Sequence, residues 1–235
     1  MSEGREQILG SIRKALGRGS LDDARVAALD QRLASPPRNL IPKRAASLDW
    51  RGQIDLFVAM AQEVQTTVVR VKSASEVPGA VADYLAERNL PAKLVATPDP
   101  QLDDVPWGDR PLLEIRRGRA EDSDLSGVTA CFAAVAETGT LMLISGSEAP
   151  TRNNFLPDNH IAVLRAEQVV ASYEDGFDRL RERQRQGDGQ WSMPRTVNYI
   201  TGPSRTGDIE QKIELGAHGP RRLHIVLIDE GESEG

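Results

Sequence analysis

The chain of 235 residues contains one cysteine, Cys131. A single thiol excludes an intramolecular disulfide and any zinc or iron–sulfur site built from several cysteines of this chain. Because Cys131 lies in the apolar run V-T-A-C-F-A-A-V-A, we expect a buried small side chain rather than a reactive thiol. The three histidines show no H-E-x-x-H spacing, so we predict no metal site.

Aromatic residues and long apolar runs are also scarce. Aromatic residues make up 4% of the chain and hydrophobic residues 39%, so the core must be aliphatic, as suits a parallel sheet covered by helices. No apolar run approaches the roughly 20 residues that span a bilayer, and the N-terminus lacks a signal-peptide core, so we expect a cytoplasmic protein. The net charge of −6 argues against a general nucleic-acid binder.

The order of patterns predicts one α/β domain with an N-terminal arm. Residues 5–17 carry an amphipathic helical stripe, and the prolines of 35–42 mark a linker, so residues 1–45 form the predicted arm. From 46 to 228, helical patterns alternate with short aliphatic strands, which indicates a mostly parallel sheet flanked by helices. One of these helices is predicted over 166–186, and its basic end, R-L-R-E-R-Q-R-Q, complements the helix dipole. Residues 229–235 are acidic, and we expect a disordered tail.

The most apolar stretch contains a charged turn. Residues 127–136 and 140–144 read as two strands joined by a tight turn at Glu137-Thr138-Gly139. A carboxylate beside buried surface needs a specific partner. Glu137 is therefore either a general base, nucleophile or ligand-binding group, or a residue that hydrogen-bonds its own turn or pairs with a cation such as Arg152.

The stretch 201–220 reads as a loop, a helix from about Asp208 to Gly216, and a second loop between two strands. Gly202, Ser204 and Thr206 ahead of a helix N-terminus would form a cup for a small anion, to which Arg205 would add charge. The same residues would equally serve as ordinary helix caps, with Asp208 and Gln211 spaced as a capping box.

The histidines differ in their surroundings. His160 directly precedes an apolar strand, where it would either orient a loop or join a site. His218 lies between glycines in G-A-H-G-P, which favours a site role, whereas His224 lies within the last strand and is expected to be structural. We predict that Ser204, Thr206 and His218 face the Glu137 turn across a common cleft. The predicted catalytic residues are Glu137 and His218, and the predicted ligand-binding residues are Thr138, Gly139, Thr140, His160, Gly202, Ser204, Thr206 and Asp208.

Four motifs in order resemble the LutC/YkgG family of LUD-domain proteins of lactate utilisation. They are R-E-x-I-L-x-x-I-R-x-A-L-G near the start, A-E-T-G-T at 136–140, P-D-N-H-I-A-V at 157–163, and G-P-S-R-T-G-D-I-E with G-x-H-G-P at 202–220. The resemblance implies a fold similar to the NagB/RpiA and CoA-transferase superfamily. It also implies two iron–sulfur partner proteins in the oxidation of L-lactate to pyruvate, with no cluster in this chain.

These observations leave three functional hypotheses. The first is an accessory or small-anion-binding subunit of a cytoplasmic lactate-oxidising system, with no identified cofactor of its own. The second is a stand-alone acyl-transfer, CoA-transfer or phosphosugar enzyme that uses Glu137 as nucleophile or base. The third is a scaffold with a vestigial pocket.

Overall fold

The computed structural model describes residues 3–17, 19–38, 40–185, 193–209 and 212–231, and it divides into two compact units, Met1–Ile41 and Pro42–Gly235. The first unit contains helices α1 (Glu3–Ala15) and α2 (Asp23–Ala34), neither of which has a buried residue. Helix α1 matches the predicted helix. Helix α2 was not predicted, and its first turn is capped by the Asp22 side chain, which accepts from the N–H of Arg25.

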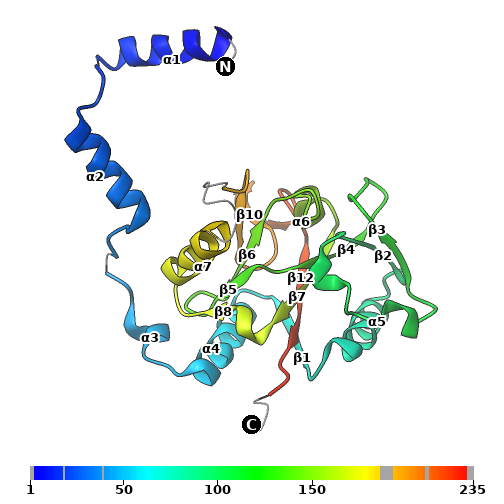
Figure 1. The fold of residues 1–235 in the computed structure, drawn as a ribbon. Coiled ribbons are helices and arrows are strands. Elements are labelled where there is room, and N and C mark those ends of the chain that lie inside the picture. The colour runs from blue at the N-terminus through cyan, green and yellow to red at the C-terminus, as the bar shows by residue number, and fades with distance from the viewer. Residues whose placement is uncertain (1–2, 18, 39, 186–192, 210–211, 232–235) are drawn as a thin grey trace. The chain divides into compact units, whose positions relative to one another are not determined.

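The second unit is built on a six-stranded sheet in the order β1-β12-β7-β4-β2-β3, with every neighbouring pair parallel (Figure 1). The predicted α/β class and mostly parallel sheet are confirmed. The strands are β1 (Thr67–Val71), β2 (Lys93–Ala96), β3 (Glu114–Arg117), β4 (Ser126–Ala130), β7 (Asn159–Arg165) and β12 (Arg222–Ile228).

Both faces of this sheet are buried, which explains why its central strands are continuous apolar runs. Alternate residues of β12 enter different cores: Ile225 and Leu227 pack with helix α4 (Trp50–Glu63), whereas Val226 and Ile228 pack with helix α5 (Val77–Glu87). The two helices therefore cover opposite faces of the sheet.

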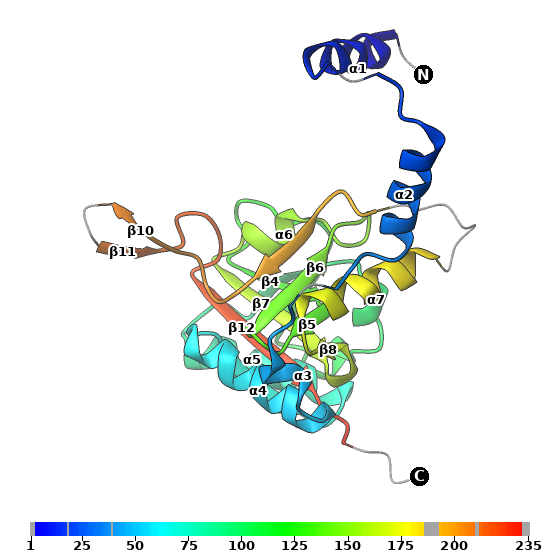
Figure 2. The same cartoon turned by 90° about the vertical axis from the view of Figure 1, so that its left-hand side faces the viewer.

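A second sheet has the strand order β8-β5-β6-β9, and buried residues on one of its faces pack in the same hydrophobic core as those of α4. The predicted strand 127–136 is in fact two strands in different sheets, because the chain leaves β4 at Ala130 and enters β5 three residues later. Helix α7 packs on the outer face of this sheet through Leu180, against Phe132 and Met142 (Figure 2). These elements are β5 (Ala133–Val135), β6 (Thr140–Ile144), β8 (Val169–Val170), β9 (Val197–Ile200) and α7 (Tyr173–Arg185).

Two predicted helices need correction. The helix predicted over 166–186 begins only at Tyr173, because residues 166–170 form a 3-10 turn and β8. The helix predicted from Asp208 to Gly216 is wrong: this segment is an antiparallel hairpin of β10 (Arg205–Ile209) and β11 (Lys212–Leu215), which projects from the unit (Figure 2). Its β-branched residues and Gly207 favour strand over helix.

The remaining elements are short. Helices α3 (Lys43–Ala46) and α6 (Arg152–Phe155) are accompanied by the 3-10 turns η1 (Ala74–Glu76), η2 (Pro100–Leu102), η3 (Trp107–Asp109) and η4 (Ala166–Gln168). Asp229, which the sequence assigns to the tail, pairs with Arg51 at 3.1 Å, and its N–H donates to the carbonyl of Val71. Residues 232–235 of the predicted tail lie outside the described residues.

The chain order creates a topological switch point in the main sheet. From β2 the chain moves outward to β3, and from β4 it moves in the opposite direction to β7 and then to β12. The neighbouring strands β2 and β4 therefore lead away to opposite sides at their carboxyl ends. A crevice at such a position is where open α/β sheets usually bind ligands.

Candidate functional site

The E-T-G-T motif forms the turn between β5 and β6 and lies against helix α4. Gly139 has a φ of +63°, a conformation that L side chains rarely adopt. A Cβ atom there would overlap the backbone nitrogen of Ala61 and lie 2.5 Å from the backbone carbon of Met60. Glycine at 139 is thus required for the turn to approach the last turns of α4.

The G-P-S-R-T-G motif meets the same end of α4. Gly202 has a φ of +78°, and a Cβ atom there would lie 2.5 Å from the carbonyl oxygen of Val64. The Arg205 guanidinium donates to that same oxygen at 2.7 Å. Arg205 therefore caps a helix C-terminus, where a cation is favoured, and the predicted use of its charge in a helix N-terminal cup is wrong.

Side-chain hydroxyls link the two motifs. Thr140 Oγ1 lies 2.7 Å from Thr138 Oγ1, 2.7 Å from Thr201 Oγ1 and 3.1 Å from the Tyr173 hydroxyl. Thr138 also lies 3.0 Å from the Tyr173 hydroxyl. The ligand-binding role predicted for Thr138 and Thr140 stays a prediction; the structure places both in this hydroxyl cluster.

Glu137 is half-buried at the start of the turn, and its N–H donates to the carbonyl of Ala171 at 3.3 Å. The alternative that Arg152 neutralises it is wrong, because Arg152 forms its ion pair with Asp122. The catalytic role predicted for Glu137 stays a prediction.

Ser204 and His218 lie together through a contact between a side chain and the backbone, and their predicted site roles stay predictions. The Ser204 hydroxyl accepts from the N–H of His218 at 3.2 Å, and the Ser204 N–H donates to the carbonyl of Pro220 at 2.9 Å. His218 itself is exposed. Thr206 lies in β10, as does Asp208, whose side chain falls outside the described part of the structure.

His160 lies in the core rather than at a ligand wall. It is fully buried in β7, and Thr129 Oγ1 lies 2.8 Å from its Nε2. Burial lowers the pKa of His160 to about 4, so the ring is neutral at pH 7. Its position favours the orienting role over the ligand-binding one.

Near the amino ends of β1 and β12 lies a cleft of about 280 Å³, which we name the arginine cleft. Arg88, Arg221 and Arg222 are the charged side chains among the described residues that line it, and no acidic side chain joins them. Arg222 donates to Asn159 Oδ1 at 3.1 Å. The other two lie 3.9 Å from exposed carboxylates, Arg88 from Glu87 and Arg221 from Asp158, and such pairs are weak.

The other walls of the arginine cleft are polar and aromatic. Thr67 and Gln65 line it from the start of β1, and Pro203 and Leu215 line it from the stretch 201–220. Tyr84 also lines it and stacks on His224, with ring centroids 4.0 Å apart. Burial and the charge of Arg88 lower the pKa of His224 to about 4, so the positive charge of the cleft comes from the guanidinium groups.

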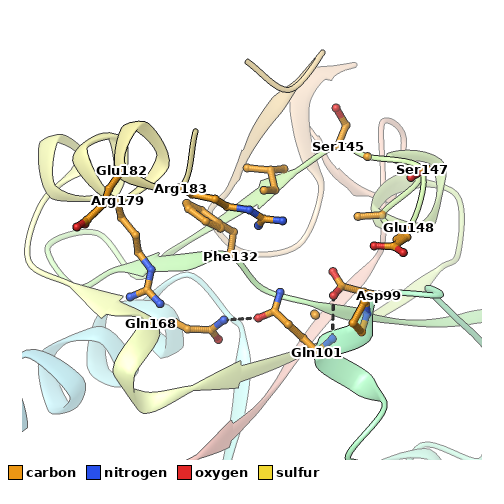
Figure 3. Close-up of a pocket in the computed structure, with 15 residues that line it drawn as sticks. Asp99, Gln101, Phe132, Ser145, Ser147, Glu148, Gln168, Arg179, Glu182 and Arg183 are labelled. Carbon is orange, nitrogen blue, oxygen red and sulfur yellow. Dashed lines mark hydrogen bonds between the residues drawn. The ribbon is translucent and has the colours of Figure 1, made fainter. Parts of the chain in front are cut away.

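A larger cleft of about 850 Å³, the carboxyl-edge cleft, lies at the switch point between β2 and β4 (Figure 3). Asp99 and Gln101 follow β2, and Phe132 follows β4. Helix α7 contributes Arg179 and Arg183. Glu137 and His218 are absent from the described linings of both clefts, so the predicted pocket that unites them has no support here.

Sequence reasoning missed the residues that give both clefts their charge. The adjacent pair Arg221-Arg222 was visible just after G-A-H-G-P, and Arg179 and Arg183 are spaced i, i+4 on a predicted helix. The basic end of that helix was interpreted as complementing the helix dipole. Arg88 had no local signal, because its place at the cleft depends on how α5 packs on the sheet.

Cys131 is fully buried, and burial raises the pKa of its thiol to about 12. Its thiol donates to the carbonyl of Ala133 at 2.9 Å. Within the described ranges, no group of three or more histidine, cysteine or acidic side chains is placed to hold a metal ion. Cys131 is therefore a poor ligand for an iron–sulfur cluster, which ordinarily takes thiolates.

The chain is similar to known proteins over most of its length. The sequence model of the LUD domain matches residues 54–228. Lactate utilization protein C of Deinococcus radiodurans is 32% identical over 160 residues, covering 66% of this chain and 70% of that protein. Lactate utilization protein C of an Exiguobacterium species is 27% identical over 232 residues, covering 95% of each chain.

A crystal structure of a DUF162 family protein from Deinococcus radiodurans matches the fold, with a TM-score of 0.56. It covers 77% of this chain and 99% of that chain at 24% identity. No helix among the described residues combines the length and the apolar character needed to cross a membrane.

Proposed function

This chain belongs to the LUD domain family, and we propose that it serves in lactate utilisation as a subunit that binds a small carboxylate. Its relatives are named lactate utilization protein C, which supports a role in lactate utilisation. The single structural observation behind the ligand class is the arginine cleft, where three guanidinium groups meet without a lining carboxylate in a protein of net charge −6.

The chemistry of the cleft suits L-lactate. A guanidinium group matches a carboxylate with two parallel N–H donors, which gives both affinity and orientation. Thr67 and Gln65 line the same cleft and offer a hydroxyl and an amide to the 2-hydroxyl of lactate. A volume of about 280 Å³ holds a three-carbon acid with room for bridging water.

In this proposal the chain is an accessory subunit, and iron–sulfur partner proteins accept the electrons when lactate becomes pyruvate. The buried thiol of Cys131, with its raised pKa, fits a subunit that holds no cluster itself. The role of this chain is then to bind and orient the acid.

Calorimetric titration of the full chain with L-lactate tests the ligand. We expect the double substitution Arg88→Ala with Arg221→Ala to weaken binding at least about tenfold, because each charged hydrogen bond contributes roughly 1.5–3 kcal/mol. Arg119→Ala, at an exposed arginine outside both clefts, is the matched control and should bind as the parent does. If lactate binds the double variant with unchanged affinity, the arginines serve only structure, with Arg88 capping the C-terminus of α5.

Anaerobic co-purification tests the role in the system. We expect iron–sulfur proteins to accompany the tagged chain, and the reconstituted mixture to lose lactate oxidation when the chain is omitted. Restoration by the parent chain but not by the Arg88→Ala, Arg221→Ala variant would link oxidation to the cleft. Unchanged activity without the chain would refute the accessory role.

A further inference from the structure

The carboxyl-edge cleft has arginines on one wall and carboxylates on the facing wall, and Glu182 adds a carboxylate on the arginine side. Figure 3 shows Arg179 and Arg183 on the side of helix α7, and Asp99 and Glu148 on the facing side. Gln101 and Gln168 lie between these walls. At about 850 Å³ the cleft has the size of a cofactor site and is three times as large as the arginine cleft, so lactate alone would leave most of it empty.

The arginine wall retains hydrogen-bonding capacity. Arg179 Nη1 donates to the carbonyl of Glu167 at 2.7 Å, and the Arg183 guanidinium lies 5.6 Å from the Phe132 ring centroid. Neither arginine has a carboxylate within ion-pair distance in the described part of the chain. Two guanidinium groups one helical turn apart form a site for a phosphate group, which each can meet with two donors.

The facing wall accepts hydrogen bonds. Asp99 is half-buried, and its Oδ1 accepts from the N–H of Gln101 at 3.0 Å, while Glu148 is exposed on the loop after β6. Carboxylates on this wall repel a second anionic group but accept hydrogen bonds from hydroxyl groups. This selects a ligand with one anionic end and a hydroxylated remainder.

Amide groups occupy the centre of the cleft. Gln168 Nε2 donates to Gln101 Oε1 at 2.7 Å and to the carbonyl of Cys131 at 2.7 Å, which fixes the orientation of both amides. Gln101 retains its amide N–H₂, and the free edge of such an amide can pair with the donors and acceptors of a heterocyclic base.

We propose that the carboxyl-edge cleft binds a nucleoside phosphate. The phosphate lies on Arg179 and Arg183, the ribose hydroxyls on Asp99 and Glu148, and the base against the Gln101 amide. The position agrees with the general preference of open α/β sheets for ligands at the switch point. This site is separate from the arginine cleft and does not depend on lactate binding there.

Calorimetric titration of the full chain with AMP, adenosine and 2′,3′-dideoxy-AMP tests the proposal. We expect AMP to bind, and adenosine and the dideoxy compound each to bind roughly tenfold more weakly, since adenosine lacks the phosphate contact and the dideoxy compound lacks the ribose-hydroxyl contact. This comparison uses only the parent protein, so it holds even if a variant fails to fold. Absence of AMP binding at millimolar concentration, with a native circular dichroism spectrum, would overturn the site.

Three variants assign the contacts. Arg179→Ala with Arg183→Ala should reduce AMP affinity to that of adenosine, whereas Arg181→Ala, on the same helix but paired with Asp178 outside the cleft, should leave it unchanged. Asp99→Asn, which keeps the cap of η2, combined with Glu148→Gln should abolish the preference for AMP over its dideoxy form. Equal AMP affinity in the parent and the arginine double variant would show that AMP binds elsewhere.

Discussion

Replacing Gly139 with alanine should destabilise the second unit more than any ordinary surface change. The backbone at 139 has a φ of +63°, and holding an alanine there costs about 1–2 kcal/mol. The added Cβ atom would also collide with backbone atoms of Ala61 and Met60 in α4, and such overpacking typically costs about 1–3 kcal/mol. Because these are backbone atoms, no rotamer change relieves the overlap. The expected loss is therefore about 2–5 kcal/mol in the free energy of unfolding.

The assay is urea and thermal unfolding followed by circular dichroism. A loss of that size should lower the melting temperature by roughly 10 °C in a unit of this size. Gly146→Ala is the matched control, because a Cβ atom at Gly146 meets no atom within 4 Å and the backbone there is not left-handed. If the free energies of unfolding of Gly139→Ala and Gly146→Ala differ by less than about 1 kcal/mol, the turn can move away from α4, and glycine is not required at position 139.

Three further predictions rest on burial. His160 and His224 have pKa values lowered to about 4, so between about pH 6.5 and pH 4 the unfolded state binds more protons than the folded state. The free energy of unfolding should therefore be highest above pH 6.5 and fall towards pH 4 by on the order of 3 kcal/mol for each ring. In His224→Phe, the slope of the free energy of unfolding against pH should be smaller by the contribution of one proton. Cys131 should resist a thiol reagent such as DTNB in the native protein and react at once in 6 M guanidinium chloride, and rapid native labelling would contradict its burial. Deleting residues 1–41 should change the melting temperature of the second unit by less than about 2 °C, because α1 and α2 bury no residue; a larger fall would show that the arm packs on it.

Most of the main sheet could be predicted because its strands are short aliphatic runs buried on both faces, a pattern with few alternatives. The second sheet could not, since the run 127–136 has no polar break where the chain passes from β4 to β5. Helix α2 was missed although Val26, Leu29 and Leu33 recur at i, i+3 and i+7, the spacing of one helix face, so its pattern was visible in the sequence. Those three residues are exposed.

The hairpin 205–215 shows where local periodicity misleads. Ile209 and Ile213 are four apart, as on one face of a helix, but K-I-E-L alternates with the period of a strand. Only the pairing of Thr206 with Glu214 and of Arg205 with Leu215 settles the choice, and pairing between segments is not visible in either segment alone. The predicted anion cup required the N-terminus of a helix at Asp208, and the hairpin takes the place of that helix.

The E-T-G-T and G-P-S-R-T-G motifs both contact the end of α4, which leads directly into the arginine cleft. Gly139 and Gly202 both lie against the last turns of this helix, and Arg205 caps its final carbonyl. The chain then passes from Val64 into Gln65 and Thr67, which line the arginine cleft together with Pro203. Displacing the end of α4 must therefore move two walls of the cleft relative to its arginines. Gly202→Ala should therefore weaken lactate binding as well as stability if the arginine cleft binds lactate.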